Sequence, residues 1–134
     1  MQATIFAAVV VALVALYWHG IRRERRTLMG RFADRPSLNF DAFYRSYYAG
    51  KLDREKVEEL LNHVAQELSI PPTKLLPSDR FDVELRPARG WEFDSGKGIL
   101  LVELDSLARK NGKPIDTAKI TTLDDYLVAM AEIY

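Results

Sequence analysis

The residues that could do chemistry in this chain are few and scattered. The two histidines, His19 and His63, lie far apart in the sequence, and neither occurs with a serine and an acid in an order that indicates a catalytic triad. Paired acids such as Asp124-Asp125 are typical of a solvated helix face or of the first turn of a helix. Metal-ligand spacing is also lacking. We therefore expect neither an enzyme nor a metal site.

The composition narrows the chemistry further. The 134-residue chain contains no cysteine, which excludes disulfides, thiol catalysis and thiolate-bound metals. Its net charge of zero is unevenly distributed, because residues 1–40 carry six arginines and two acids, whereas residues 41–134 carry 13 basic and 17 acidic residues. We expect no nucleic-acid partner, since the basic cluster follows an apolar run and the larger part of the chain is acidic.

An apolar segment opens the chain. From Ala3 to Leu16 the only side chain that is not apolar is Thr4. As a helix, residues 3–21 span roughly 28 Å, which is close to the hydrocarbon thickness of a bilayer. A cleaved signal peptide is the alternative, but no Lys or Arg precedes the run and no small-x-small cleavage site ends it. We therefore expect residues 1–21 to be a single transmembrane anchor that contacts the lipid bilayer.

The residues after this segment give the expected anchor an orientation. Aromatic rings favour the membrane interface, and basic residues favour the cytoplasmic side. We therefore predict a single-pass protein of the inner (cytoplasmic) membrane, with a basic juxtamembrane linker at residues 22–38 and the C-terminal domain in the cytoplasm. The predicted membrane contacts are Tyr17, Trp18, Arg22, Arg23, Arg25 and Arg26.

Four helical segments are expected after the linker. Residues 39–50 contain aromatic side chains at helical spacing, and this stripe either packs in the core or lies on the membrane. Residues 54–68 repeat apolar side chains behind a candidate N-cap, Asp53. Residues 99–108 have leucines spaced by three, and a capping-box-like Thr122-Leu123-Asp124-Asp125 opens the last helix. The stretch before residue 99 is interpreted as loop. The fold class is therefore all-α.

The order of these segments follows a known pattern. Its parts are the amphipathic helix, the loop stretch Pro77-Ser78-Asp79-Arg80-Phe81-Asp82-Val83-Glu84-Leu85, a second helix, Lys113-Pro114-Ile115-Asp116, and Lys119-Ile120-Thr121-Thr122-Leu123. Together they resemble the acyl carrier protein family, or phosphopantetheine-binding fold. The resemblance implies a small four-helix bundle over residues 51–134, to which the transmembrane helix is an addition.

The resemblance also implies an attachment site. In that family, a serine in an Asp-Ser-Leu motif at the start of the second helix carries 4'-phosphopantetheine, whose thiol holds acyl groups. Asp94-Ser95 lies where this motif is expected and supplies the candidate cofactor-binding residues, but Gly96 and Gly98 replace the apolar residues that follow the family's serine. Asp105-Ser106-Leu107 matches the motif literally but falls inside the helix. A helix N-cap is the structural alternative for Ser95.

These departures favour a bundle that carries no prosthetic group. We expect a non-catalytic adaptor that binds a protein partner at the inner membrane, and the alternative is a working membrane-tethered acyl carrier with 4'-phosphopantetheine on Ser95. Aromatic side chains near Ser95 are candidate anchors, and carrier proteins present an acidic second helix to their partners. The candidate partner-binding residues are therefore Trp91, Phe93, Glu103 and Asp105.

Overall fold

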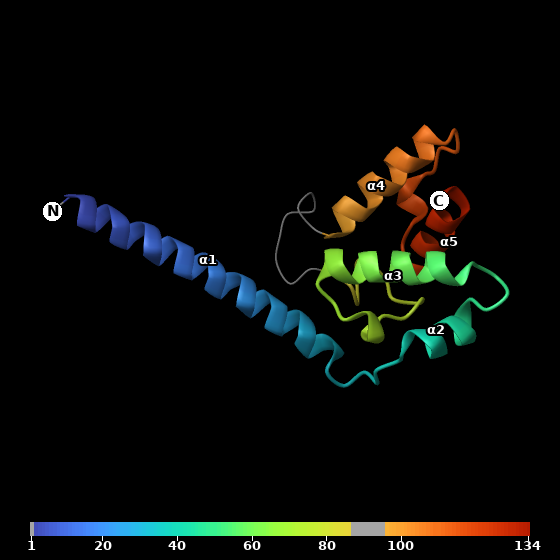
Figure 1. The fold of residues 1–134 in the computed structure, drawn as a ribbon, viewed down its shortest axis with the longest axis horizontal. Helices are drawn as coiled ribbons and strands as arrows, with labels where there is room; N and C mark the ends of the chain where they lie inside the picture. The colour runs from blue at the N-terminus through green and yellow to red at the C-terminus, as the bar shows by residue number, and fades with distance from the viewer. Residues whose placement is uncertain (1, 87–95) are drawn as a thin grey trace.

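The computed structural model describes residues 2–86 and 96–134. These residues are mostly helical, and no β-strand occurs among them; Arg80 and Thr122 form an isolated antiparallel bridge. Figure 1 shows a long helix leading into a bundle of shorter ones. The elements in chain order are α1 (Gln2–Phe32), α2 (Phe40–Tyr47), α3 (Arg54–Leu68), η1 (Pro72–Lys74), α4 (Gly96–Lys110), η2 (Thr117–Lys119) and α5 (Leu123–Ile133).

Helix α1 corrects the predicted anchor. Within the described ranges, no helix combines the length and the apolar character that crossing a membrane requires. The expected transmembrane helix, the fold class that included it and the single-pass location in the cytoplasmic membrane are therefore wrong. The expected contact with a lipid bilayer stays a prediction. The physical difference is that the helix does not end after the apolar run. It continues through Arg22 to Phe32, so that apolar and charged residues share one 31-residue helix.

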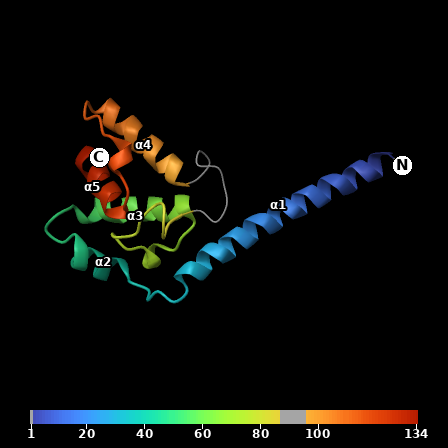
Figure 2. The same ribbon diagram turned by 180° about the vertical axis from the view of Figure 1, so that it is seen from behind.

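The residues predicted to contact a membrane lie on this helix. Tyr17, Trp18 and Arg22 are exposed, and the side chains of Arg23, Arg25 and Arg26 lie outside the described part of the structure. Both views show α1 projecting away from the bundle (Figures 1 and 2). Its last residue, Phe32, is buried in the core, so the helix is joined to the bundle by packing as well as by the chain.

The aromatic stripe forms α2 and packs in the core. Asn39 caps the helix, because its side chain accepts a hydrogen bond of 2.8 Å from the backbone N–H of Ala42. Phe43 and Tyr48 are buried, and Phe43 makes an edge contact with Tyr47 at 5.4 Å between ring centroids. Packing in the core therefore accounts for the aromatic character of positions 43 and 48, and these two residues do not need to lie on a membrane.

Helix α3 begins and ends where the periodicity indicates. Asp53 is its N-cap and accepts a hydrogen bond of 3.1 Å from the N–H of Lys56. Ser69 ends the helix in a left-handed conformation, with φ of 55°. One face is buried against α2, α4 and α5, and it consists of Val57, Leu60, Leu61, Val64, Ala65 and Leu68.

The loop after α3 contributes to the core without forming a strand. Phe81 and Leu85 are buried, whereas Val83 between them is exposed. The ring of Phe81 meets the ring of Tyr126 edge-on, with centroids 6.3 Å apart. Tyr126 is completely buried, and its hydroxyl has no hydrogen-bond partner within the described residues. Burial raises the pKa of this hydroxyl, and the negative charges of Glu103 and Glu67 add to the effect.

Helix α5 closes the bundle with a complete capping box. The hydroxyl of Thr122 accepts a hydrogen bond from the N–H of Asp125 at 3.1 Å, and the Asp125 carboxylate accepts one from the N–H of Thr122 at 3.0 Å. Partial burial alone raises the pKa of Asp125, but hydrogen bonds from the N–H groups of Thr121 and Thr122 outweigh it and hold the pKa below its ordinary value. The capping box thus depends on an ionised Asp125.

A candidate docking cleft beside helix α4

The packing of α4 on the bundle determines which of its side chains are exposed to solvent. Leu100, Leu104 and Ala108 are fully buried, and their spacing of four places them on one face of the helix. Val102 lies on the opposite side and is 70% exposed, and Ile99 is 42% exposed. The helix therefore presents an apolar surface to solvent as well as one to the core.

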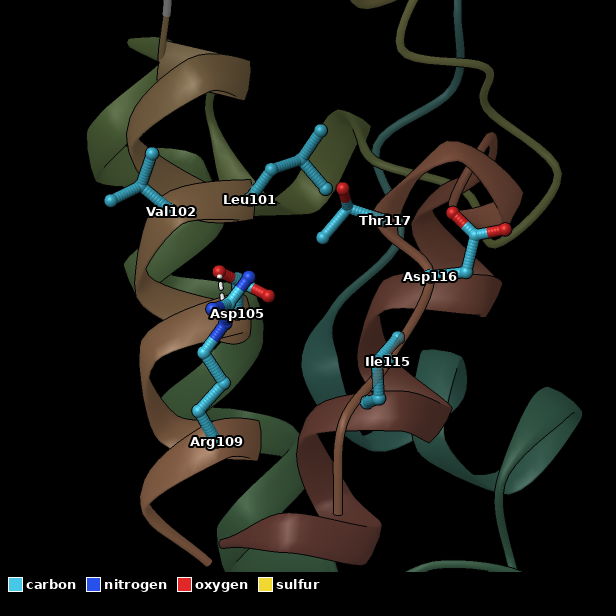
Figure 3. A pocket seen from close by; sticks show the side chains of 7 residues that line it. All are labelled: Leu101, Val102, Asp105, Arg109, Ile115, Asp116 and Thr117. Carbon is cyan, nitrogen blue, oxygen red and sulfur yellow. Dashed lines mark ion pairs between the residues drawn. The ribbon is translucent and has the colours of Figure 1, made fainter. Parts of the chain in front are cut away.

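A cleft lies between α4 and the segment that leads into η2. It has a volume of about 330 Å³ and is lined by Leu101, Val102, Asp105, Arg109, Ile115, Asp116 and Thr117. Figure 3 shows Leu101 and Thr117 pointing toward each other across the cleft, with Val102 on the outer side of α4. The lining is partly apolar and partly polar, so a partner could place both an apolar and a polar side chain in this space.

The polar groups of the cleft are held in place by local contacts. The carboxylate of Asp105 pairs with the guanidinium of Arg109 one helical turn later, at 3.0 Å (Figure 3). The carboxylate of Asp116 caps η2 by accepting a hydrogen bond of 3.1 Å from the N–H of Ala118. The cap at Asp116 orders the η2 side of the cleft, whereas the exposed pair of Asp105 and Arg109 contributes little to the rigidity of α4.

The other acid predicted to bind a partner is oriented differently. Glu103 lies 2.6 Å from the Nε2 atom of His63 on α3, and both side chains are partly exposed. This contact joins α3 and α4 on the side of α4 that faces α3. Of the two predicted acids, the structure thus brings only Asp105 to the cleft.

The start of α4 is packed tightly on the end of α3. A Cβ atom on Gly96 would lie 2.5 Å from the carbonyl oxygen of Glu67 and 2.9 Å from a methyl group of Leu68. Only glycine therefore fits at position 96 without displacing the backbone of α3. In the first turn of α4, the ammonium of Lys97 pairs with the carboxylate of Asp82 at 2.5 Å. The glycine that departs from the carrier motif has a structural reason.

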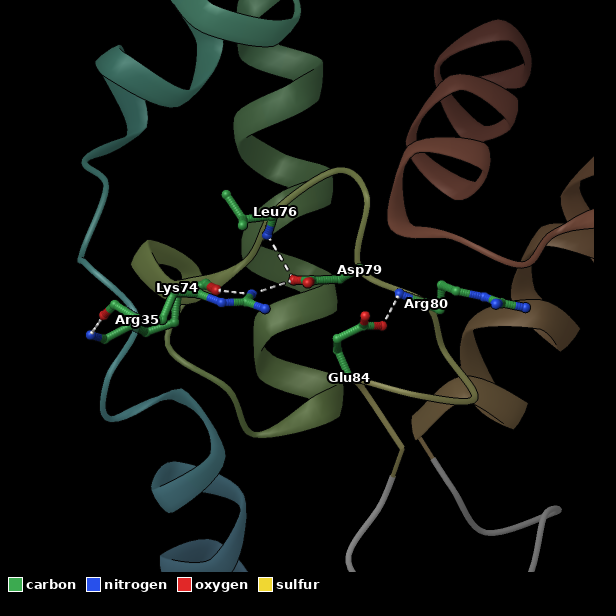
Figure 4. Close-up of polar contacts among 6 residues, drawn as sticks. All are labelled: Arg35, Lys74, Leu76, Asp79, Arg80 and Glu84. Atoms are coloured by element: carbon green, nitrogen blue, oxygen red, sulfur yellow. Dashed lines mark hydrogen bonds and ion pairs between the residues drawn. The ribbon is translucent and has the colours of Figure 1, made fainter.

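The loop before α4 is held by a polar network, which Figure 4 shows. The carboxylate of Asp79 accepts hydrogen bonds of 2.8 Å from Arg35 and from the N–H of Leu76. Arg35 also donates to the carbonyl oxygen of Lys74 at 2.8 Å, and the Lys74 ammonium donates to the carbonyl oxygen of Arg35. The network fastens the segment after α1 to the loop.

A second contact tightens the same loop. The Glu84 carboxylate accepts a hydrogen bond of 2.8 Å from the N–H of Arg80 (Figure 4). Hydrogen bonds from backbone N–H groups, first that of Arg80, lower the pKa of Glu84. Glu84 therefore stays ionised and keeps the turn closed near neutral pH.

The remaining predicted site residues are not placed by the structure. Trp91, Phe93, Asp94 and Ser95 lie outside the described residues. Helix α4 begins at Gly96, directly after Ser95 in the sequence. The sequence analysis did not identify the cleft or three of the residues that line it, Val102, Arg109 and Thr117. The sequence signal that could have indicated the cleft is Val102, because this apolar residue lies outside the buried stripe of α4.

The cleft has the properties of a binding surface. Across residues 2–86 and 96–134, no group of three or more His, Cys, Asp or Glu side chains is arranged to hold a metal ion. What α4 offers is an apolar surface, an adjoining cleft and an ion pair at its edge.

Comparisons of the chain with protein-family models, with curated proteins and with solved structures found no match in any of the three.

Proposed function

We propose that this protein is a non-catalytic adaptor, an acyl-carrier-protein-like helical bundle that binds a protein partner along α4. The observation that carries the proposal is the 70% exposed Val102 beside a cleft of about 330 Å³. Exposed apolar side chains next to a shaped cleft are typical of protein-binding surfaces. The buried stripe of Leu100, Leu104 and Ala108 holds α4 rigidly, so the surface is ready for binding.

A photo-crosslinking experiment tests this proposal. A photoreactive amino acid replaces Val102 in the full-length chain, and a matched protein carries the same group at Val83, which is exposed but does not line the cleft. We expect a discrete crosslinked partner with the group at position 102 and none with the group at position 83. Equal crosslinking at both positions, or none at position 102, would contradict the adaptor function.

A second candidate function is an acyl carrier with 4'-phosphopantetheine on Ser95. It rests on the start of α4 at Gly96, which makes Ser95 the residue before a helix N-terminus. A phosphodiester is favoured there, because the positive end of the helix dipole attracts negative charge. Lys97 in the first turn adds a positive charge, although it also pairs with Asp82. The bound group would supply a thiol for acyl transfer.

Intact-mass spectrometry separates the two functions. The full-length chain is produced with and without a broad-specificity phosphopantetheinyl transferase. A gain of one phosphopantetheine that Ser95→Ala abolishes and Ser106→Ala preserves would establish the carrier. An unmodified chain removes the carrier function and leaves the adaptor, since docking along α4 needs no prosthetic group.

A further inference from the structure

Positive charge gathers at the end of α4. Residues 109–119 contain four basic residues and one acid, whereas the rest of residues 41–134 carries nine basic and 16 acidic residues. The four are Arg109, Lys110, Lys113 and Lys119, here called the four-cation cluster, and all of them are exposed. An otherwise acidic part of the chain therefore presents a local positive field beside the cleft.

Helix ends explain where some of these cations lie. Arg109 and Lys110 are in the last turn of α4, where positive charge interacts favourably with the helix dipole. The chain then turns back at Gly112, which has φ of 67° (Figure 1). The Lys113 ammonium donates to the carbonyl oxygen of Glu132, in the last turn of α5, at 3.3 Å. Because these contacts leave the side chains exposed to solvent, the cluster remains accessible to a charged partner.

Arg109 belongs both to the cluster and to the cleft. It lines the cleft with Leu101 and Val102, and its side chain is 75% exposed. Its contact with Asp105 is made through Nε, and among residues 2–86 and 96–134 it has no other ion pair. The outer edge of the guanidinium, which carries the two Nη atoms, therefore faces no carboxylate of the described chain. This edge matches a carboxylate with two parallel hydrogen bonds.

The two acids that line the cleft do not favour a basic occupant. The carboxylate of Asp105 already pairs with Arg109 at 3.0 Å, and that of Asp116 already accepts a hydrogen bond from Ala118 at 3.1 Å. An incoming cation would compete with Arg109 for Asp105 and would be repelled by the four-cation cluster. An incoming carboxylate meets the outer edge of Arg109 and is attracted by the other three cations.

We propose that the partner presents an acidic amphipathic segment to this surface. An apolar side chain of the segment lies against Leu101 and Val102, and a neighbouring carboxylate binds Arg109. This inference rests on the adaptor function proposed above and names the chemistry of its partner. The apolar contact supplies most of the affinity, whereas the cluster accelerates association and selects acidic over basic segments.

Selection from a random-sequence peptide library on the full-length chain tests the proposal. Peptides that also bind Val102→Glu are discarded, so that those retained depend on the cleft. In the retained peptides, we expect Asp and Glu to outnumber Lys and Arg and to adjoin a large apolar residue.

Fluorescence anisotropy of the strongest peptide then measures the role of the cluster. Arg109→Gln and the double variant Lys113→Glu/Lys119→Glu should each weaken binding at least tenfold. Lys51→Glu, an exposed position outside the cluster, should change it less than twofold. Binding should also weaken between about 0.1 M and about 1 M salt, because the Debye length falls from roughly 10 Å to 3 Å. All of the substituted residues are exposed, so the core of the bundle is unchanged.

The outcomes separate this inference from the adaptor function. Retained peptides without an acidic excess, or an acidic peptide that binds both cluster variants as tightly as the natural protein, would overturn the acidic partner and leave docking along α4 intact. Recovery of no peptide that depends on Val102 would overturn both. Phosphatidylserine vesicles or duplex DNA that bind through the cluster and independently of Val102 would assign the cluster to another class of partner and overturn the acidic segment.

Discussion

The carboxylate of Asp79 and the guanidinium of Arg35 lie 2.8 Å apart and connect two segments that are 44 residues apart in the sequence. Asp79 is 2% exposed and Arg35 is 22% exposed, so this ion pair is largely shielded from water. It fixes the chain that follows α1 against the loop that precedes α4. The projecting helix α1 is therefore fastened to the bundle by this pair as well as by the buried Phe32.

Loss of this pair should destabilise the fold. Asp79→Ala leaves Arg35 and the N–H of Leu76 without their acceptor, and we expect the free energy of unfolding to fall by about 2–4 kcal/mol. Urea denaturation measures the change. Asp82→Ala is the matched control, because Asp82 forms an exposed ion pair with Lys97, for which a change of about 0–1 kcal/mol is typical. Equal losses of unfolding free energy in the two variants would show that the buried ion pair contributes no more stability than the exposed one.

The close approach of α3 and α4 predicts a strong effect at Gly96. In Gly96→Ala the new methyl group meets the carbonyl oxygen of Glu67 at 2.5 Å, so the backbone has to move. We expect the free energy of unfolding to fall by about 1–3 kcal/mol, as in other overpacked sites. Gly30→Ala, where no atom lies within 4 Å of the added Cβ, should be neutral or stabilising. Thermal denaturation of both variants measures these changes. A Gly96→Ala variant as stable as the natural protein would contradict the close packing of α4 on α3.

The hydroxyl of Tyr126, which has no hydrogen-bond partner among residues 2–86 and 96–134, predicts a gain in stability when it is removed. A buried polar group without a hydrogen bond costs about 1–3 kcal/mol, and Tyr126→Phe removes that group while keeping the ring beside Phe81. We therefore expect Tyr126→Phe to be at least as stable as the natural protein.

Tyr48 provides the opposite case for the same chemical change. Its hydroxyl donates a hydrogen bond of 2.7 Å to the carboxylate of Asp124, so Tyr48→Phe should lower the free energy of unfolding by about 1–3 kcal/mol. Urea denaturation of both variants gives the comparison. A Tyr126→Phe variant that is less stable than Tyr48→Phe would show that the Tyr126 hydroxyl has a stabilising contact after all.

The capping box of α5 predicts a pH dependence. The pKa of Asp125 is below its ordinary value of 3.8 in the folded state, so the carboxylate stabilises the fold above that value. This contribution should be lost as the pH falls below about 4 toward the folded-state pKa, because the protonated acid accepts hydrogen bonds poorly. Asp125→Asn should therefore lose stability at pH 7 and show a weaker acid dependence than the natural protein. Circular dichroism melting between pH 2 and 7 measures it.

Glu132→Gln is the control for this prediction. Glu132 is an exposed acid on the same helix, and replacing it should leave the acid dependence unchanged. If Asp125→Asn retained the full acid dependence of the natural protein, the dependence would have to come from another carboxylate, and the capping box would not explain it.

Local sequence signals predicted α3 and α5 well. Asp53 and Thr122 act as N-caps where the sequence indicated them, because capping is a contact between residues three positions apart and needs no tertiary information. The range of α3, Arg54–Leu68, follows from its apolar repeat together with the N-cap Asp53. In such segments local propensity and tertiary packing agree.

Helix α4 shows where this reasoning ends. Leucines spaced by three identified a helix from residue 99, whereas the structure begins it at Gly96 and buries Leu100, Leu104 and Ala108, spaced by four. Gly96 departs from the carrier-protein motif, which has an apolar residue after its serine, and the contact of Gly96 with the α3 backbone explains this departure. Leu101 therefore faces the cleft, and the cleft itself depends on where η2 passes α4, which no local pattern encodes.

The arginine-rich segment was also misjudged from local composition. Residues 22–38 had the polarity of a linker, but α1 runs through most of them to Phe32, which is buried in the core. The expected membrane anchor fails on a separate finding, because no helix in the described ranges is both long and apolar enough to cross a membrane. Side chains such as Arg35 act through distant partners, and distant partners are not visible in a sequence.

The most direct test of the adaptor function is the affinity of the crosslinked partner for two surface variants. Isothermal titration calorimetry compares the natural protein with Val102→Glu, which places a charge at the exposed apolar edge of the cleft, and with Val83→Glu, which places one elsewhere. We predict that Val102→Glu weakens binding at least tenfold, a loss of about 1.4 kcal/mol or more, and that Val83→Glu changes it less than twofold. An unchanged affinity for Val102→Glu would contradict docking along α4.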